Sequence, residues 1–189
     1  MAKWIAKNDY LADSEMQNNG EIIWSFFGGQ EGWTREAVAA LLGNMQGEST
    51  VNPGLWESLI PYGGGYGLVQ WTPYTVYSEW AGPGWENNGT KQCECIMHEY
   101  RDGGQWYPTN EYPMTFEEWA HSTGDVGELA YAFMYNYERP ASLDHPERKA
   151  YAENWYGWLD GKPWDPDIPP SGGGRLPVWL YFKLGKGGR

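Results

Sequence analysis

The sequence predicts a mainly α-helical domain with a small irregular region of loops and short β structure. Three observations support this fold class. One segment carries apolar side chains at helical spacing, two later segments begin with the Thr/Asp-x-x-Glu pattern of a helix start, and residues 49–74 are rich in Gly and Pro. A chain of 189 residues is long enough for one domain with a substantial core.

The first helix is expected to run from Ser14 to Phe27 and to stop at Gly28 and Gly29. Its inward face is expected to carry Ile22, Ile23, Phe26 and Phe27. The second helix is expected over residues 34–47, where Thr34 is a suitable N-cap. Its apolar side chains follow the i, i+3, i+4, i+7 spacing of a helix with one buried face, at Val38, Leu41, Leu42 and Met45.

The remaining elements follow from the same signals. Residues 49–74 are expected to form loops with a short, irregular hairpin, which suits the lip of a cleft. Further helices are expected at Tyr74–Trp80, at Asn88–Arg101, after Thr115, after Asp125, and at Pro146–Leu159. We expect residues 1–159 to form the domain, residues 160–174 a Pro/Gly-rich linker, and residues 175–189 an apolar, basic tail.

Glu48 is the candidate catalytic residue, because it lies where the second helix runs out. The negative pole of the helix and apolar surroundings would both disfavour its charged form and raise its pKa. A general acid needs such a pKa near neutral pH. The alternative is that Glu48 only decorates a frayed helix end.

The residues around Glu48 resemble a known family. A Glu48–Ser49 pair at a helix end, the segment Gly67-Leu68-Val69-Gln70, and the later segment Tyr137–Pro140 are similar to the lysozyme-like superfamily, which includes goose-type lysozymes and lytic transglycosylases. The run is more similar still to phage tail lysozymes. This resemblance implies a lysozyme-like helical fold with the loop region flanking a substrate cleft, and cleavage of the β-1,4 bond between N-acetylmuramic acid and N-acetylglucosamine with Glu48 as general acid.

The resemblance also implies roles for residues near the cleft. Ser49, Gln70 and Tyr137 would contact substrate or position the acid. Tyr66 and Trp71 would shape the groove, although either could instead belong to the core. The chain has 13 Trp, 14 Tyr and 5 Phe, and aromatic rings both stack on sugars and fill cores.

The second catalytic carboxylate is not obvious. No Asp lies between Ser49 and Pro73, and Glu57 is the one Glu there. Glu57 or Glu138 would position water for hydrolysis; otherwise no carboxylate participates and the sugar assists, as in a lytic transglycosylase. Glu138 has a structural alternative, in which it pairs with a basic neighbour. A catalytically inactive wall-binding protein of the tail tip is a third hypothesis.

Charge and cysteine usage exclude other classes of protein. The 25 acidic residues all precede residue 175, and the whole chain carries a net charge of −12, which argues against nucleic-acid binding. Cys93 and Cys95 are too close to form a useful disulfide, and on one helix they point to nearly opposite sides, so a zinc shared with His98 is not expected. We expect buried thiols, no metal and no cofactor.

The N-terminal segment and the C-terminal tail bear on where the protein acts. No signal peptide and no membrane-spanning stretch are evident. The family resemblance therefore favours a place in the phage virion at the tail tip, acting on bacterial peptidoglycan; the alternative is retention in the host cytoplasm until lysis. Residues 175–189 are expected either to dock on another phage tail protein or a membrane surface, or to fold back on the domain.

Overall fold

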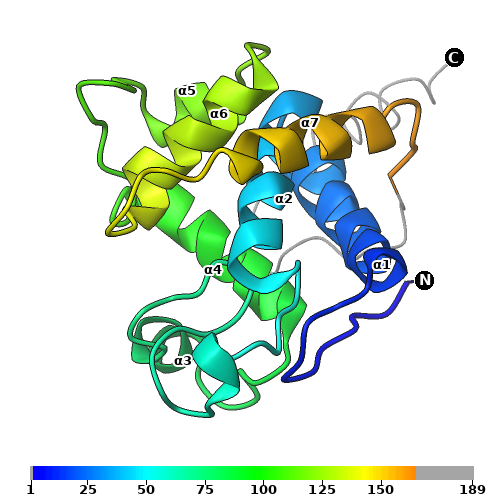
Figure 1. Ribbon diagram of the computed structural model, residues 1–189, viewed down its shortest axis with the longest axis vertical. Coiled ribbons are helices and arrows are strands. Elements are labelled where there is room, and N and C mark those ends of the chain that lie inside the picture. Colours follow the sequence, from blue (N-terminus) through cyan, green and yellow to red (C-terminus); the bar gives the residue numbers. More distant parts are fainter. Residues whose placement is uncertain (1, 165–189) are drawn as a thin grey trace, which may run out of the picture.

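The computed structural model describes residues 2–164, and these form a mainly α-helical domain, as predicted. The expected linker beyond residue 164 and the tail 175–189 lie outside the described residues. Figure 1 shows the α-helices in chain order. They are α1 (Asp13–Ile23), α2 (Arg35–Ser49), α3 (Thr75–Ala81), α4 (Gly89–Asp102), α5 (Phe116–Ala120), α6 (Val126–Phe133) and α7 (Glu147–Trp158).

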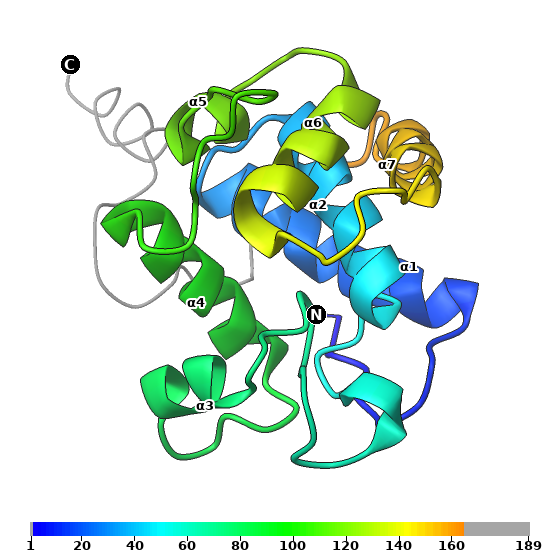
Figure 2. The ribbon, with the colours of Figure 1, turned by 60° about the vertical axis from the view of Figure 1, so that its left-hand side comes forward.

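Helix α2 lies at the centre of the fold, packed by α1, α6 and α7. Gly43 permits the close approach of α7, because a Cβ atom at Gly43 would lie 2.7 Å from the backbone nitrogen of Ala152. The lower part of the molecule consists of α3 and the loops of residues 50–74 (Figure 1). Helix α4 runs diagonally from this lower part towards the side of the molecule that carries α5 (Figure 2).

The start of α2 matches the sequence expectation, but its end does not. The Thr34 hydroxyl accepts a hydrogen bond from the Ala37 amide at 3.2 Å and so caps the helix as predicted. The helix continues to Ser49 and is closed by Thr50, whose φ of 55° is left-handed. Glu48 therefore lies within the last helical turn.

The expected stop of the first helix at Gly28 and Gly29 is wrong. Helix α1 ends at Ile23 and passes directly into a π-helix, Trp24–Gln30, which contains both glycines. A Cβ atom at Gly28 would lie 2.3 Å from the Trp24 ring. Gly28 is thus a packing glycine, which allows an indole to lie against the backbone. The four residues expected to face inward are all buried.

The loop region of residues 50–74 holds less β structure than expected. It contains a short 3₁₀ helix, Glu57–Leu59, and isolated bridges that join Tyr66 to Trp56 and to Trp71. Asn52 ties this region to the N-terminal segment, because its side-chain amide donates to the backbone carbonyls of Lys7 and Asp9, each at 2.7 Å.

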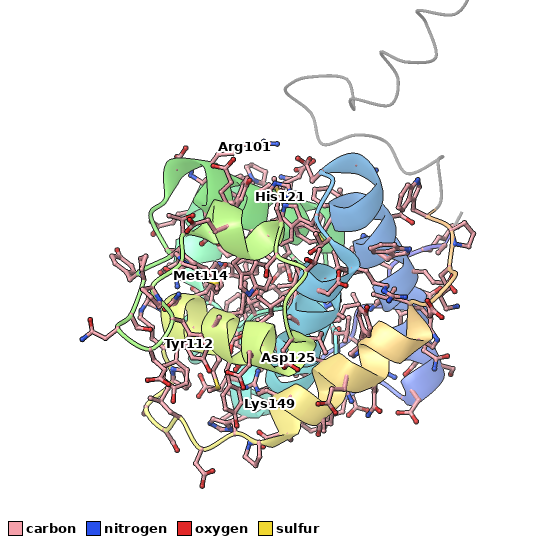
Figure 3. All side chains as sticks on the ribbon, turned by 90° about the horizontal axis from the view of Figure 1, so that it is seen from above. Arg101, Tyr112, Met114, His121, Asp125 and Lys149 are labelled. Carbon is pink, nitrogen blue, oxygen red and sulfur yellow. The ribbon has the colours of Figure 1, made fainter. Side chains whose placement is uncertain are left out.

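Two side-chain caps begin the helices of the upper part. Thr115 and Glu118 form the predicted capping box at α5, and the Asp125 carboxylate accepts from the Glu128 amide at the start of α6. Figure 3 shows Asp125 and Lys149 close together where α6 and α7 lie side by side, and Lys149 pairs there with Glu128. A π-helix, Met134–Glu138, continues α6.

Cys93 and Cys95 are buried, unpaired thiols in α4, as the sequence predicted. Burial raises the pKa of both. Within the described part of the chain, no helix combines the length and apolar character that a membrane crossing requires.

Candidate active site

A groove of about 750 Å³ lies between the end of α2, the loop region and the π-helix that follows α6. Six of the eight site residues expected from the sequence line it. They are Glu48, Glu57, Gln70, Trp71, Tyr137 and Glu138. The fold therefore gathers residues that lie up to 90 positions apart in the chain around one concave surface.

Glu48 lies on the wall of this groove with 21% of its side chain exposed. Its Oε1 atom accepts a hydrogen bond from Nη2 of Arg148 at 2.5 Å. The apolar surroundings expected for Glu48 are therefore wrong, because a guanidinium group from α7 lies against the carboxylate.

Arg148 reaches Glu48 across the backbone of Gly47. A Cβ atom at Gly47 would lie 2.4 Å from Nε of Arg148, so only glycine leaves room for this side chain. The guanidinium is 5% exposed, and its Nη1 atom donates to the backbone carbonyl of Asn44 at 2.7 Å. Glycine inside a helix lowers helix stability by about 0.5–1 kcal/mol relative to alanine. Gly47 is thus explained by the approach of Arg148.

Glu138 is the second carboxyl group held by Arg148, with its Oε2 atom 3.4 Å from Nη1. The expected pairing with a basic residue is confirmed, but the partner is Arg148 rather than the adjacent Arg139, whose Nη1 donates to the backbone carbonyls of Gln105 and Asn136. Burial, followed by the charge of Glu48, raises the pKa of Glu138 well above that of an ordinary glutamate, and Arg148 offsets this in part.

These three groups form a compact charge cluster, which we call the Glu48–Arg148–Glu138 cluster. Two carboxylates close to one guanidinium leave one negative charge in excess. Because burial raises the pKa of Glu138, a single proton shared by the pair is favoured over two charged carboxylates. Oε1 of Glu138 and Nε of Arg148 are buried without a hydrogen-bond partner, so the cluster is not a fully satisfied structural ion pair.

Trp71 and Tyr137 both line the groove and meet the same buried carboxylate beneath it. The Trp71 indole donates to Oε1 of Glu99 at 3.0 Å, and the Tyr137 hydroxyl donates to Oε2. Burial raises the pKa of Glu99, against the lowering effect of these two hydrogen bonds. Gln70 is fixed differently: its amide donates to the backbone carbonyls of Leu55 and Gly67.

Ser49 and Tyr66 do not line the groove. The Ser49 hydroxyl is buried, close to the carbonyl oxygens of Met45 and Leu68 at 3.1 and 3.0 Å, and accepts from the Asn52 amide. Ser49 thus joins the end of α2 to the loop region, which places it behind the acid rather than against a substrate. The Tyr66 ring is 1% exposed, so the core alternative holds for Tyr66.

Glu57 lies on the groove but is tied to the loop that carries it. Its Oε2 atom accepts a hydrogen bond from the Gly65 amide at 2.7 Å. It belongs to the lower, loop-rich part of the groove, whereas Glu48 and Glu138 belong to the helical part. Glu57 is therefore the one groove carboxyl, among the described residues, that does not contact the Arg148 cluster.

Sequence reasoning missed Arg148 and Glu99. Arg148 lies 100 positions after Glu48, and no local pattern links the two. Glu99 has a partial signal, because it lies on the predicted Asn88–Arg101 helix three and four residues after the buried Ile96 and Cys95. Among residues 2–164, no group of three or more His, Cys, Asp or Glu side chains is arranged to hold a metal ion.

Comparison with known proteins identifies the family of this chain. Residues 18–159 match the family model described as phage tail lysozyme. The chain is also 42% identical over 165 residues to morphogenesis protein 1 of Bacillus phage B103, a match that covers 83% of this chain and 43% of that relative. The chain thus spans less than half the length of this relative. The family match covers every groove-lining residue except Tyr10, and every member of the Glu48–Arg148–Glu138 cluster, and we conclude that the chain belongs to the phage tail lysozyme family.

Proposed function

We propose that this protein is a peptidoglycan-degrading glycosidase of the phage tail, which cleaves the β-1,4 bond between N-acetylmuramic acid and N-acetylglucosamine with Glu48 as general acid. The observation that carries the proposal is the position of Glu48 on the groove, beside a second carboxyl group and a shared guanidinium. A glycan strand lying in the groove is the substrate, and the virion tail is the site of action.

The cluster supplies a proton in two stages. Burial and the charge of Glu48 raise the pKa of Glu138, so a proton on this pair is favoured and Glu138 can supply it to Glu48. Glu48, the more exposed of the two, passes the proton to the bridging oxygen as the glycosidic bond breaks. Arg148 stabilises the negative charge that the pair then gains.

The position of Glu138 bears on the second half of the reaction. A base that activates water, or a nucleophile, acts from the opposite face of the sugar ring from the acid. Glu138 shares a guanidinium with Glu48 and so serves better as its proton partner than as that base. Glu57, in the loop-rich part of the groove, is the candidate base for hydrolysis.

A lytic transglycosylase is the second candidate, and the Glu57 geometry favours it. The Glu57 carboxylate is held by the Gly65 amide, which reduces its freedom to activate water. Without a second carboxylate, the 6-hydroxyl group of the muramic acid attacks C1 and gives a 1,6-anhydro product, and its proton passes to the carboxylate that Glu48 became when it protonated the leaving oxygen. Mass analysis of the products from purified peptidoglycan separates the two reactions, since only hydrolysis adds water.

The test is the Glu48→Gln variant with Glu153→Gln as its control, because Glu153 is exposed on α7. Removal of a general acid typically lowers the rate by about 10²–10⁴-fold. We expect Glu48→Gln to release almost no saccharide from peptidoglycan, and Glu153→Gln to match the wild type. Thermal unfolding of both variants checks that the fold is kept. Substantial activity in Glu48→Gln contradicts the proposed role, and an inactive wild type that still binds peptidoglycan supports the wall-binding alternative.

A further inference from the structure

Glu99 lies outside the groove, yet it holds two side chains that form the floor of the groove. It is 9% exposed, on helix α4. Trp71 and Tyr137 donate to its two carboxylate oxygens, one to each. These partners come from different parts of the chain: Trp71 from the loop region, and Tyr137 from the π-helix after α6.

Both partners adjoin other residues that line the groove. Tyr137 immediately precedes Glu138, the proton partner of Glu48, and Trp71 immediately follows Gln70, which lines the groove. The rings are also fixed on their faces. Tyr137 stacks on Phe133 with centroids 4.5 Å apart, and Trp71 stacks on Tyr77 at 4.9 Å. The contacts with Glu99 add the hydrogen bond that fixes each ring within its own plane.

A purely structural role does not explain a carboxylate at this position. Removing a carboxylate from water is costly, and well-packed apolar residues of similar volume are usually as stabilising or more so. A Leu at this position with Phe at the two partner positions would fill the same space without desolvating a charge. A polar triad is favoured where a unique side-chain arrangement is needed.

We infer that Glu99 is a positioning residue of the active site, which fixes the Trp71 indole and the Tyr137 phenol with one carboxylate and thereby sets the placement of Glu138 beside Glu48. This inference rests on the proposed function for its catalytic consequence. In structural terms, the buried carboxylate of Glu99 joins the loop-rich part of the groove to its helical part.

The Glu99→Gln and Glu99→Leu variants test the inference. A Gln side chain has nearly the same shape and still accepts from the Trp71 indole, while its amide nitrogen faces the Tyr137 hydroxyl, which can accept as well as donate. A Leu side chain supports neither bond. We expect kcat on soluble glycan fragments to fall about tenfold in Glu99→Gln and roughly a hundredfold in Glu99→Leu, because small displacements of reacting groups have effects of this size.

Matched indole variants separate positioning from loss of stability. Trp71→Phe removes the hydrogen bond to Glu99, whereas Trp119→Phe removes a similarly buried indole bond to the Leu129 carbonyl, which does not involve Glu99. All variants are assayed well below their unfolding temperatures. We expect Trp71→Phe to lose activity and Trp119→Phe to keep it. The Glu99→Leu and Tyr137→Phe losses should also be less than additive, because both remove the same interaction.

Binding separates this inference from the proposed function. If the wild type cleaves glycan and Glu99→Leu keeps its kcat and KM, the inference is overturned while the proposed function stands. If the wild type cleaves nothing, the proposed function fails, and titration with a tetramer of N-acetylglucosamine decides the inference. Weaker binding by Glu99→Leu and Trp71→Phe, but not by Trp119→Phe, supports a positioning role; equal binding by all variants overturns it.

Discussion

The guanidinium of Arg148 lies directly over the backbone of Gly47, and this contact is what brings a positive charge to the carboxylate of Glu48. The contact is possible because Gly47 has no side chain, and because Gly43, one turn earlier, lets α7 pack closely on α2. Two glycines of a central helix, which weaken that helix intrinsically, are therefore part of the candidate active site.

The Gly47→Ala variant is expected to lose most of its activity. The new methyl group would displace the Arg148 side chain, which moves the charge away from Glu48. Saccharide release from peptidoglycan measures the effect. The control is Gly157→Ala in α7, where a Cβ atom would meet nothing within 4 Å. That variant should keep full activity and gain about 0.4–1 kcal/mol in unfolding free energy. Equal activity in both variants contradicts the role assigned to Gly47.

The Arg148→Leu variant is expected to be destabilised by about 3–5 kcal/mol, since it leaves the negative charge of the Glu48–Glu138 pair without its cation. Urea unfolding measures this loss. The double variant Arg148→Leu/Glu138→Leu should regain most of the stability, because the one carboxylate that remains is that of Glu48, which is partly exposed to solvent, but it should not regain activity. Recovery of activity in the double variant would show that the cluster is structural only.

The Glu138→Gln variant should change how stability depends on pH. The native state raises the pKa of Glu138 above its ordinary value of 4.5, so between that value and the native pKa the folded protein binds a proton that the unfolded chain has released. Wild-type stability therefore falls as pH rises through this window, by up to about 1.4 kcal/mol per pH unit, and Glu138→Gln lacks this fall.

Urea unfolding of wild type and Glu138→Gln from about pH 4.5 to about pH 7.5 measures the difference. The gap in unfolding free energy should change with pH in favour of the variant as pH rises. Glu153→Gln, at an exposed position of α7, serves as the control and should run parallel to the wild type. A constant gap for Glu138→Gln would mean that Glu138 is already charged in the native state.

The Tyr66→Phe variant should affect stability and leave the groove intact. The Tyr66 hydroxyl accepts from the Asn87 amide at 2.7 Å, away from the groove. Its loss should lower the unfolding free energy by about 1 kcal/mol without changing KM for soluble glycan. Tyr137→Phe should show the opposite pattern, with a clear loss of kcat. A raised KM in Tyr66→Phe would show that Tyr66 contributes to substrate binding.

Local sequence patterns predicted much of this fold. Apolar spacing and the Thr34 cap located α2, and capping residues located α5 and α6, because these signals act within one or two turns of a helix. The two π-helices were not predictable in this way. The first contains a close contact of the Trp24 ring with Gly28, which the spacing of apolar residues does not reveal.

The same distinction applies to the candidate site: residues marked by a local feature were predictable, and residues defined by long-range packing were not. Glu48 was identifiable because a helix end is a local feature, and the family resemblance supplied Gln70 and Tyr137. Tyr66 and Trp71 lie in one aromatic segment, and only the folded chain separates the buried ring from the one that reaches the groove. Arg148 was unpredictable because its importance arises from the packing of α7 on α2.

The separation of 100 residues between Glu48 and Arg148 has a consequence for synthesis. During synthesis, α2 leaves the ribosome before α7. Glu48 therefore has no guanidinium partner until α7, close to the end of the described domain, has also emerged. Products that terminate early, or that are cut by a protease before α7, cannot assemble the charged cluster. The cluster can therefore form only after the chain has been synthesised through α7.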